Sequence, residues 1–269
     1  MLRARDEIAS IPNQIPENPL FLPRKWGINA LYGQNPELLS TATHTVTAIV
    51  PIKHESERYP RKNFRDFMDQ PMYQVILKTL GRVPEIDEII VNTDSAEVLE
   101  GAAALPKVRL IERQPELLGN HVTMNTILDK DVEATTQEHF LQTHCTNPLL
   151  RVETIQRAIA QYFAGLDQYD SLYSVELLKK RLYDAQNQAI NHRNDILLPT
   201  QDLPNVYMEN SNIFMFSRSS FRAAGNSRIG QKPQPFEMHY VEGLDIDYED
   251  DFHLAELVAR HADRFPALR

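Results

Sequence analysis

Residues 46–63 read VTAIVPIKHESERYPRKN, an apolar run followed by a basic loop. Its beginning, 46–52, is a largely apolar run of the kind that forms a buried strand. The loop that follows carries five basic side chains, Lys53, His54, Arg58, Arg61 and Lys62. Ligands of open α/β sheets bind beyond the carboxyl ends of the strands, so a basic loop at this point is suited to hold phosphates. A merely solvated basic loop is the alternative.

Apolar runs and helical patterns alternate along the chain after this loop. Further strands are expected at 88–93, 108–111 and 139–143, and helices at 72–83, 95–105, 123–134 and 152–163. Ser95 is suited to cap the second of these helices. This order predicts a three-layer, Rossmann-like α/β fold, in which a mostly parallel sheet carries helices on both faces.

The expected domain organisation follows from where the alternation of strands and helices begins and where it is interrupted. Residues 1–44 contain five prolines and no sustained period, which predicts an irregular arm. Residues 45–269 form one α/β domain. Within it, residues 174–208 are more polar and break the alternation, so they are a candidate dimerisation arm.

Bulk composition narrows the class of partner. The formal net charge of −9 argues against nucleic acid and anionic membranes, which attract basic surfaces. With Cys145 as the only cysteine, no disulfide within the chain is possible. No apolar run approaches the length of a membrane span, and the first residues lack an apolar signal core. A cytoplasmic location is expected.

A second group of charges lies near the C-terminus, where residues 243–252 read GLDIDYEDDF. Alternation with apolar residues predicts a strand that projects Asp245 and Asp247 from one face. Two such carboxylates suit a hard divalent ion, although their spacing alone favours a solvated or capping pair. The acidic residues 249–251 are expected to begin a helix.

The basic loop resembles the signature P-x-(K/R)-x-x-S-x-R-x-P-x-K-N of the acylneuraminate cytidylyltransferases. The matching residues are Pro51, Lys53, Ser56, Arg58, Pro60, Lys62 and Asn63. Many members have arginine in place of Lys53, so that a bidentate phosphate contact is lost here while the charge is kept. The loop contains no glycine, which distinguishes it from Walker and Rossmann phosphate loops.

The resemblance implies a nucleotide-diphospho-sugar transferase fold and CTP as a substrate. Lys53, Arg58 and Lys62 would hold phosphates, and Ser56 and Asn63 would contact the nucleotide. The D-I-D sequence is similar to the family's metal motif, which implies Mg²⁺ or Mn²⁺ on Asp245 and Asp247. The catalytic set implied is Lys62, Arg58 and Asp247.

Weaker similarities add candidate contacts to the nucleotide. Residues 113–117, RQPEL, resemble an R-P-x-E-L loop whose arginine lies near the cytosine, which makes Arg113 a candidate for the base. Asn125 stands where relatives have small polar residues that contact base or ribose. Its neighbour Met124 departs from that pattern.

The candidate sugar contacts come from two further segments. Residues 141–150, LQTHCTNPLL, match L-Q-P-T-S-P-L-R in two registers, so either Gln142 or His144 faces the sugar. Asn210 matches the asparagine of an N-G-x-I-Y stretch. Octulosonate enzymes of the family have an aspartate near 141–150, and its absence here favours the sialate-like branch.

Two departures affect the choice of sugar. Thr200 and Met208 stand where some sialate enzymes have arginines near the sugar. Arg228 has no counterpart in the family's pattern and is a candidate to replace a missing cation.

The hypothesis is a homodimeric cytidylyltransferase that joins CTP to a nine-carbon 2-keto sugar acid. A nucleotidyltransferase for another acid sugar, such as an octulosonate, is one alternative. A nucleotide-binding homologue without turnover is the other.

Overall fold

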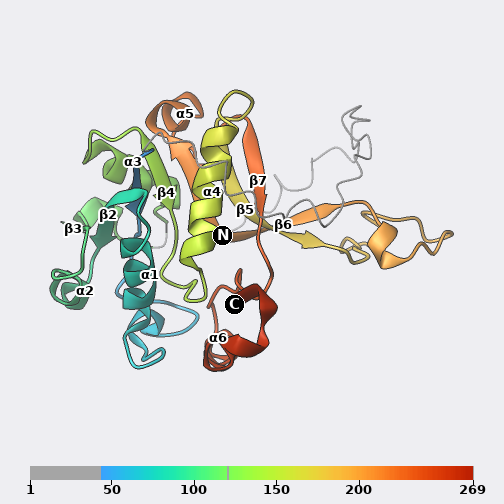
Figure 1. Cartoon of the computed structure of the whole chain (residues 1–269), viewed down its shortest axis with the longest axis horizontal. Helices are drawn as coiled ribbons and strands as arrows, with labels where there is room; N and C mark the ends of the chain where they lie inside the picture. Colours follow the sequence, from blue (N-terminus) through green and yellow to red (C-terminus); the bar gives the residue numbers. More distant parts are fainter. Residues whose placement is uncertain (1–43, 120, 269) are drawn as a thin grey trace. The chain divides into compact units, whose positions relative to one another are not determined.

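The computed structural model describes residues 44–119 and 121–268, and the predicted arm lies outside these ranges apart from residue 44. The strands are β1 (Val46–Ile49), β2 (Ile86–Thr93), β3 (Val108–Glu112), β4 (His139–Gln142), β5 (Ser171–Leu178), β6 (Val206–Ser217) and β7 (Pro233–Glu237). The helices are α1 (Met72–Gly81), α2 (Ala96–Gly101), α3 (Met124–Glu133), α4 (Val152–Ala164), α5 (Arg218–Ala223) and α6 (Glu249–Arg260) (Figure 1).

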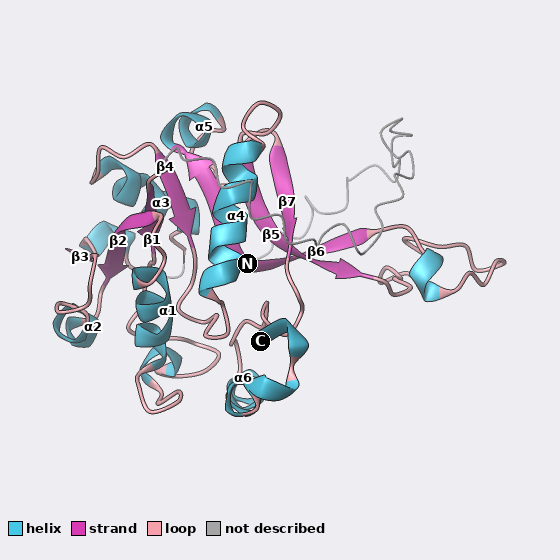
Figure 2. Cartoon of the chain, in the orientation of Figure 1, coloured by secondary structure: helices cyan, strands magenta, loops and turns pink. Residues whose placement is uncertain are grey.

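All of these strands join one sheet in the order β3-β2-β1-β4-β6-β5-β7 (Figure 2). Each neighbouring pair is parallel except the two pairs that include β6, which runs antiparallel to β4 and to β5. The prediction of a mostly parallel α/β sheet is therefore confirmed. β1 lies inside the sheet between β2 and β4, and the basic loop leaves its carboxyl end.

Alternate residues of β1 pack into two separate cores, because successive side chains of a strand point to opposite faces. Val46 and Ala48 belong to a cluster that includes apolar residues of α1, α2 and α4. Ile49 belongs to a cluster with residues of α3 and α5. Helices thus cover both faces of the sheet, as the three-layer prediction requires.

A third apolar cluster joins the basic loop to the C-terminal helix. Tyr59 and Phe67, on either side of the 3₁₀ turn Lys62–Phe64, pack edge-on against Phe252 of α6, with ring centroids 6.0 and 5.7 Å apart. Ile246, which is fully buried, belongs to the same cluster. This packing brings the basic loop beside the D-I-D segment.

The pairing of β5 with β6 is interrupted by a bulge. Ser174 of β5 faces several residues of β6: its hydroxyl accepts from the amides of Asn212 (3.2 Å) and Ile213 (2.7 Å) and donates to Asn210 Oδ1 (2.6 Å). Ser211 takes a left-handed φ of 55° there, at the glycine position of the N-G-x-I-Y pattern. Bulges of this kind re-aim side chains and bend strands.

One local prediction needs correction. Residues 244–247 are not a strand but an irregular segment tied to Thr146, whose carbonyl accepts from the Ile246 amide at 2.9 Å. Alternation misled here because Ile246 is buried against α6 rather than within a sheet. Part of the segment 174–208 is strand: β5 and β6 stay paired from Val175 with Glu209 to Leu178 with Val206, and they project beyond the rest of the sheet (Figure 2).

Helix boundaries otherwise follow the sequence pattern closely. Ser95 caps α2 as expected, its hydroxyl accepting from the Val98 amide, although the helix ends at Gly101 rather than near residue 105. Within the described residues, none of the helices combines the length and hydrophobicity that a membrane span needs.

Candidate active site

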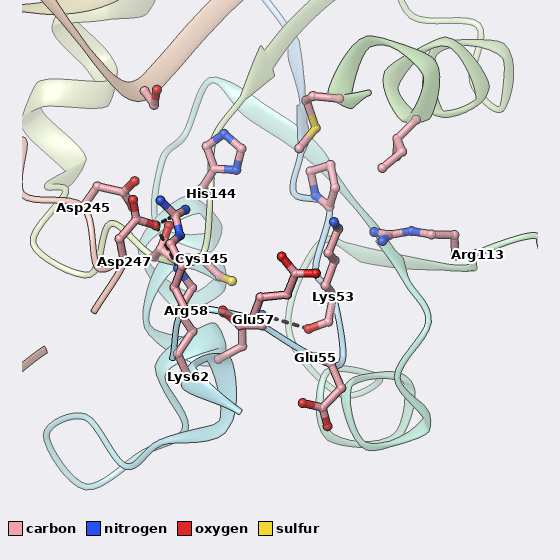
Figure 3. A pocket seen from close by; sticks show the side chains of 17 residues that line it. Lys53, Glu55, Glu57, Arg58, Lys62, Arg113, His144, Cys145, Asp245 and Asp247 are labelled. Atoms are coloured by element: carbon pink, nitrogen blue, oxygen red, sulfur yellow. Dashed lines mark hydrogen bonds and ion pairs between the residues drawn. The ribbon is translucent and has the colours of Figure 1, made fainter. Parts of the chain in front are cut away.

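A cavity of about 600 Å³ opens at the carboxyl ends of the parallel strands (Figure 3). Lys53 follows β1, Arg113 follows β3 and His144 follows β4, so three strands contribute to its wall. In Figure 3 Asp245, Asp247 and Arg58 gather on one side of the cavity and Arg113 on the other. Of the residues predicted from sequence, those in the wall are Lys53, Ser56, Arg58, Lys62, Asn63, Arg113, His144, Asp245 and Asp247.

Lys62 joins the two charged segments directly. Its ammonium donates to the Ile246 carbonyl at 2.5 Å and to Asp247 Oδ1 at 3.2 Å. The same carboxylate oxygen lies 2.5 Å from an Arg58 Nη2 nitrogen. The Lys62 residue is only 8% exposed, so its charge is largely removed from water and depends on these oxygens.

The turn that carries Lys62 is braced by its neighbours. Asn63 Nδ2 donates to the Lys53 carbonyl at 2.8 Å, which ties the end of the loop to its start. Arg61 has a φ of 57°, a left-handed conformation that turns the chain into the 3₁₀ segment. Lys62 and Asn63 are both buried as a result, while Arg58 stays about half exposed.

Asp247 is held from the other side by the first turn of α6. Asp251 Oδ2 accepts from the backbone amides of Asp247 (3.0 Å) and Tyr248 (2.7 Å). Residues 249–251 are therefore acidic first-turn residues, as predicted, and one of them positions the carboxylate.

Asp245 is half-buried and has a perturbed pKa. Burial raises the pKa of its carboxyl group, and the nearby Asp247 charge raises that pKa further, while a hydrogen bond from Thr146 opposes both. Asn147 Nδ2 also donates to Asp245 Oδ1, at 3.3 Å. A cation bound between the two carboxylates would relieve their repulsion.

This donor set fits a magnesium-like ion that shares its shell with substrate. Among the described residues, no group of three or more histidine, cysteine, aspartate or glutamate side chains forms a closed metal cage. Mg²⁺ in phosphoryl-transfer sites needs no such cage, because it is held by one or two carboxylates plus substrate phosphates and water. Asp245 and Asp247 are two carboxylates of the kind that such an ion would use.

Arg113 is fixed by a buried polar network. Its Nε donates to Asn92 Oδ1 at 2.8 Å and its Nη2 to the Asn92 carbonyl at 2.7 Å. Asn92 in turn donates to Asp131 Oδ1 at 2.6 Å. Burial lowers the pKa of Arg113 and raises the pKa of Asp131 to about 6. Arg113 is thus held rigidly at the cavity wall.

The structure separates the two registers of the segment after β4. His144 lines the cavity, whereas Gln142 is fully buried behind it. Asn125 and Asn210 do not line the cavity either: Asn125 Oδ1 accepts from the Arg228 amide at 3.3 Å, and Asn210 Oδ1 accepts from Ser174. Cys145 is buried and its thiol pKa rises to about 12, in agreement with a packing role.

Sequence reasoning missed several wall residues. Thr146 and Ser211 line the cavity, and each lies near a predicted site residue in the sequence. Ser211 occupies the glycine position of the N-G-x-I-Y pattern, a signal from which it could have been predicted. No sequence pattern indicated the hydrogen bond between Asp131 and Asn92, because these residues lie on α3 and β2 and come together only in the folded chain.

Comparison with known proteins matches this architecture. The family model described as "Cytidylyltransferase" matches residues 47–260, which include the basic loop, the cavity wall and the D-I-D segment. The chain belongs to the cytidylyltransferase family. The resemblance inferred from the basic loop is confirmed.

Curated relatives of this cytidylyltransferase-family chain are distant. The chain is 21% identical over 126 residues to a pseudaminic acid cytidylyltransferase from Campylobacter jejuni, covering 45% of this chain and 54% of the relative. It is 30% identical over 77 residues to a 3-deoxy-manno-octulosonate cytidylyltransferase from Nitratidesulfovibrio vulgaris, covering 28% and 31%. The chain thus spans about half the length, or less, of the curated relatives it matches.

Solved structures share the fold at low sequence identity. A CMP:2-keto-3-deoxy-manno-octonic acid synthetase complexed with CTP aligns with a TM-score of 0.57 and 14% identity, over 81% of this chain and 99% of that one. A 4-diphosphocytidyl-2C-methyl-D-erythritol synthase from Anaerococcus prevotii aligns with a TM-score of 0.59 and 14% identity, with the same coverage.

The buried Asp131 predicts a pH-dependent stability effect. A carboxyl group whose pKa is raised by folding stabilises the protein below its unfolded pKa, 3.8, and loses that contribution as pH rises through about 6. An Asp131→Asn variant does not titrate there. Its melting temperature relative to the parent is therefore expected to rise between pH 4 and 7, by the equivalent of about 2 kcal/mol. Paired melts across this range test it, and a constant difference would contradict it.

Proposed function

We propose that this chain transfers the cytidylyl group of CTP to a nine-carbon 2-keto sugar acid. The anomeric hydroxyl oxygen attacks the α-phosphorus, the bond from that phosphorus to the bridging oxygen breaks, and pyrophosphate leaves. The hydroxyl proton passes to a base or to solvent. The products are the CMP-sugar and pyrophosphate.

The observation that carries this proposal is the contact of Lys62 with Asp247 inside the cavity. It brings phosphate-binding cations and metal-binding carboxylates together, which is what transfer between phosphates and a hydroxyl requires. Lys53, Arg58 and Lys62 take the phosphates and neutralise charge on the departing pyrophosphate. Arg113, held by Asn92, is the contact proposed for the cytosine.

Asp245 and Asp247 are proposed to hold Mg²⁺ or Mn²⁺. When bound, such an ion polarises the phosphate and lowers the pKa of the attacking hydroxyl. His144 is a poor candidate for the general base, because burial and the charges of Arg228 and Lys62 lower its pKa to about 3. It serves as a neutral hydrogen-bonding group.

The choice of an acid sugar rests on the family's relatives and on the pattern after β4. The curated relatives include enzymes named for pseudaminic acid and for an octulosonate. The segment 141–150 lacks the aspartate of octulosonate enzymes, which favours a nine-carbon acid. A cavity of about 600 Å³ lies within the range of sites that bind small molecules.

We propose a homodimer because the arm, residues 174–208, exposes apolar side chains where it projects from β5 and β6. Apolar side chains on it face solvent, among them Leu197, which is 79% exposed, and Met208, which is 46% exposed. Tyr183 and Ile190 are each 51% exposed. Apolar groups gathered on one projection are typical of an interface, and a second copy of the chain is the partner proposed.

The first test of this function is nucleotide and substrate choice. With Mg²⁺ present, CTP is expected to raise the melting temperature more than ATP, GTP or UTP, because a ligand at 100 times its Kd stabilises the folded state by about 2.7 kcal/mol. Pyrophosphate release with a panel of acid sugars then identifies the acceptor. Equal protection by all four nucleotides contradicts the cytidine assignment, and CTP binding without release for every sugar indicates a homologue without turnover.

The second test concerns the metal ligand. Asp247→Asn is expected to lower kcat by about 100-fold or more, since it removes one charge-stabilising group from the reacting centre. Much of the CTP protection should persist, because Lys53, Arg58 and Lys62 keep their charges. The matched control is Glu249→Gln, an exposed carboxylate in the same turn, which should be nearly silent. Normal turnover by Asp247→Asn, with normal Mg²⁺ dependence, contradicts the proposed metal site.

The third test concerns assembly. Light scattering at micromolar concentration is expected to give a dimer, and Leu197→Asp to weaken it, because a charge would then have to be buried in the interface. A fully active monomer rules out the proposed role of the arm.

A further inference from the structure

Arg228 lies on a rigid segment between α5 and β7. The amides of Gln231 and Lys232 donate to the Asp170 carboxylate at 2.8 and 2.9 Å. A Cβ at Gly230, whose φ is 71°, would come within 2.4 Å of the same carboxylate. The Arg228 amide donates to Asn125 Oδ1 at 3.3 Å. These contacts fix the backbone from which the guanidinium projects.

The Arg228 guanidinium stacks on one aromatic ring and donates one hydrogen bond. Its Cζ lies 3.6 Å from the centroid of the Phe214 ring, a stacked geometry that suits arginine. Nη1 donates to Gln142 Oε1. Among the described residues, Nε and Nη2 have no hydrogen-bond partner, and no carboxylate lies within ion-pair distance.

This contact determines the hydrogen-bonding state of the cavity wall. Because Gln142 Oε1 accepts from Arg228, its Nε2 must donate, and it does so to the Thr143 carbonyl (2.9 Å) and to His144 Nε2 (3.2 Å). His144 Nε2 is then an acceptor, so the neutral ring carries its proton on Nδ1. Nδ1 has no partner among the described residues, which leaves an N–H donor on a ring that lines the cavity.

The charge of Arg228 is incompletely compensated. Burial lowers its pKa to about 10, opposed by the more distant Glu209, so the group stays charged at neutral pH. Partly buried charges are normally paired, and here the neighbours are an aromatic ring and a neutral amide. Beside it stands the neutral donor of His144. An arginine and an N–H donor without an acid between them form a site for an anion.

The substrate proposed above supplies a suitable anion. In a 2-keto sugar acid, the anomeric carbon bears both the attacking hydroxyl and the carboxylate, so the carboxylate is carried to the α-phosphate together with the hydroxyl. The triphosphate already has the cations of the loop after β1. Arg228 does not itself line the cavity: it contacts Phe214 of β6 and Gln142 at the end of β4, and Gln142 in turn contacts His144 of the cavity wall.

We propose that Arg228, stacked on Phe214 and aligned by Gln142, binds the carboxylate of the acid sugar, with His144 Nδ1–H as the second donor. This proposal rests on the proposed function. It assigns to this chain's own residue the cation that some sialate enzymes place at the positions of Thr200 and Met208.

The test crosses enzyme variants with a change in the substrate. Pyrophosphate release is measured at saturating CTP and Mg²⁺ for the acid sugar that the parent protein uses best and for its C1 carboxamide, which lacks the charge. The parent is expected to show a 10- to 100-fold higher KM for the amide, the range of a charge-assisted hydrogen bond. Arg228→Gln is expected to raise KM for the acid by a similar factor and to lose the discrimination between acid and amide.

Controls separate binding from folding. Arg222→Gln removes the same charge from an exposed arginine on α5, paired with Asp129, and should leave both KM values unchanged. Arg228→Lys keeps the charge without the planar fork and should fall between Arg228→Gln and the parent. CTP should still protect both Arg228 variants against heat, since the nucleotide contacts lie elsewhere.

Two results are distinguishable. No pyrophosphate release by the parent with any acid sugar overturns the proposed function. Release by the parent with equal KM for acid and amide, or with the parent's KM in Arg228→Gln, overturns only the carboxylate site. If Arg228→Gln does not fold, the acid–amide comparison in the parent and the Arg228→Lys variant decide the question.

Discussion

The site depends on one contact, the ammonium of Lys62 against the Ile246 carbonyl and the Asp247 carboxylate. Lys62 and Asp247 lie 185 residues apart in sequence. An ammonium that is largely removed from water needs oxygen atoms around it, so the contact stabilises the site only if the chain holds it closed. The apolar cluster of Tyr59, Phe67 and Phe252 does this, because it buries both segments against the same helix.

Charge compensation then explains why the cavity wall carries both signs. Arg58 and Lys62 approach one oxygen of Asp247, while burial raises the pKa of Asp245. In the absence of phosphates the cations are partly neutralised by this carboxylate, which limits their mutual repulsion. Incoming phosphates would take over the cations and leave the carboxylates available for a metal ion. The side chains that neutralise one another in this structure would then be the ones that bind the substrate proposed here.

The fold and the two charged segments of the site, the basic loop and the D-I-D segment, were predictable from the sequence. The contacts of the buried residues behind the cavity wall were not. The strand–loop–helix order and the basic loop are local patterns, so the sheet and residues such as Lys62 and Asp247 followed from the sequence. The strand predicted around Asp245 was wrong because burial against a helix produces the same alternation as burial in a sheet. Gln142 and Asn125 have the right residue type, yet they lie behind the wall. Both contact Arg228, which comes from another part of the chain and has no sequence spacing that links it to them.

Arg228 lies in the α/β core, whereas the positions at which some sialate enzymes have arginines lie on the projecting arm, residues 174–208. Thr200 and Met208, where some sialate enzymes have arginines, are exposed on the arm of this chain. A long cationic side chain at such a position loses rotamer freedom when it orders around a ligand. Arg228 has its guanidinium already placed on Phe214, a buried residue of β6 that pairs with β4 next to the cavity. A cation held in advance against the core binds an anion at a smaller entropic cost, and it does so without needing the arm to be ordered.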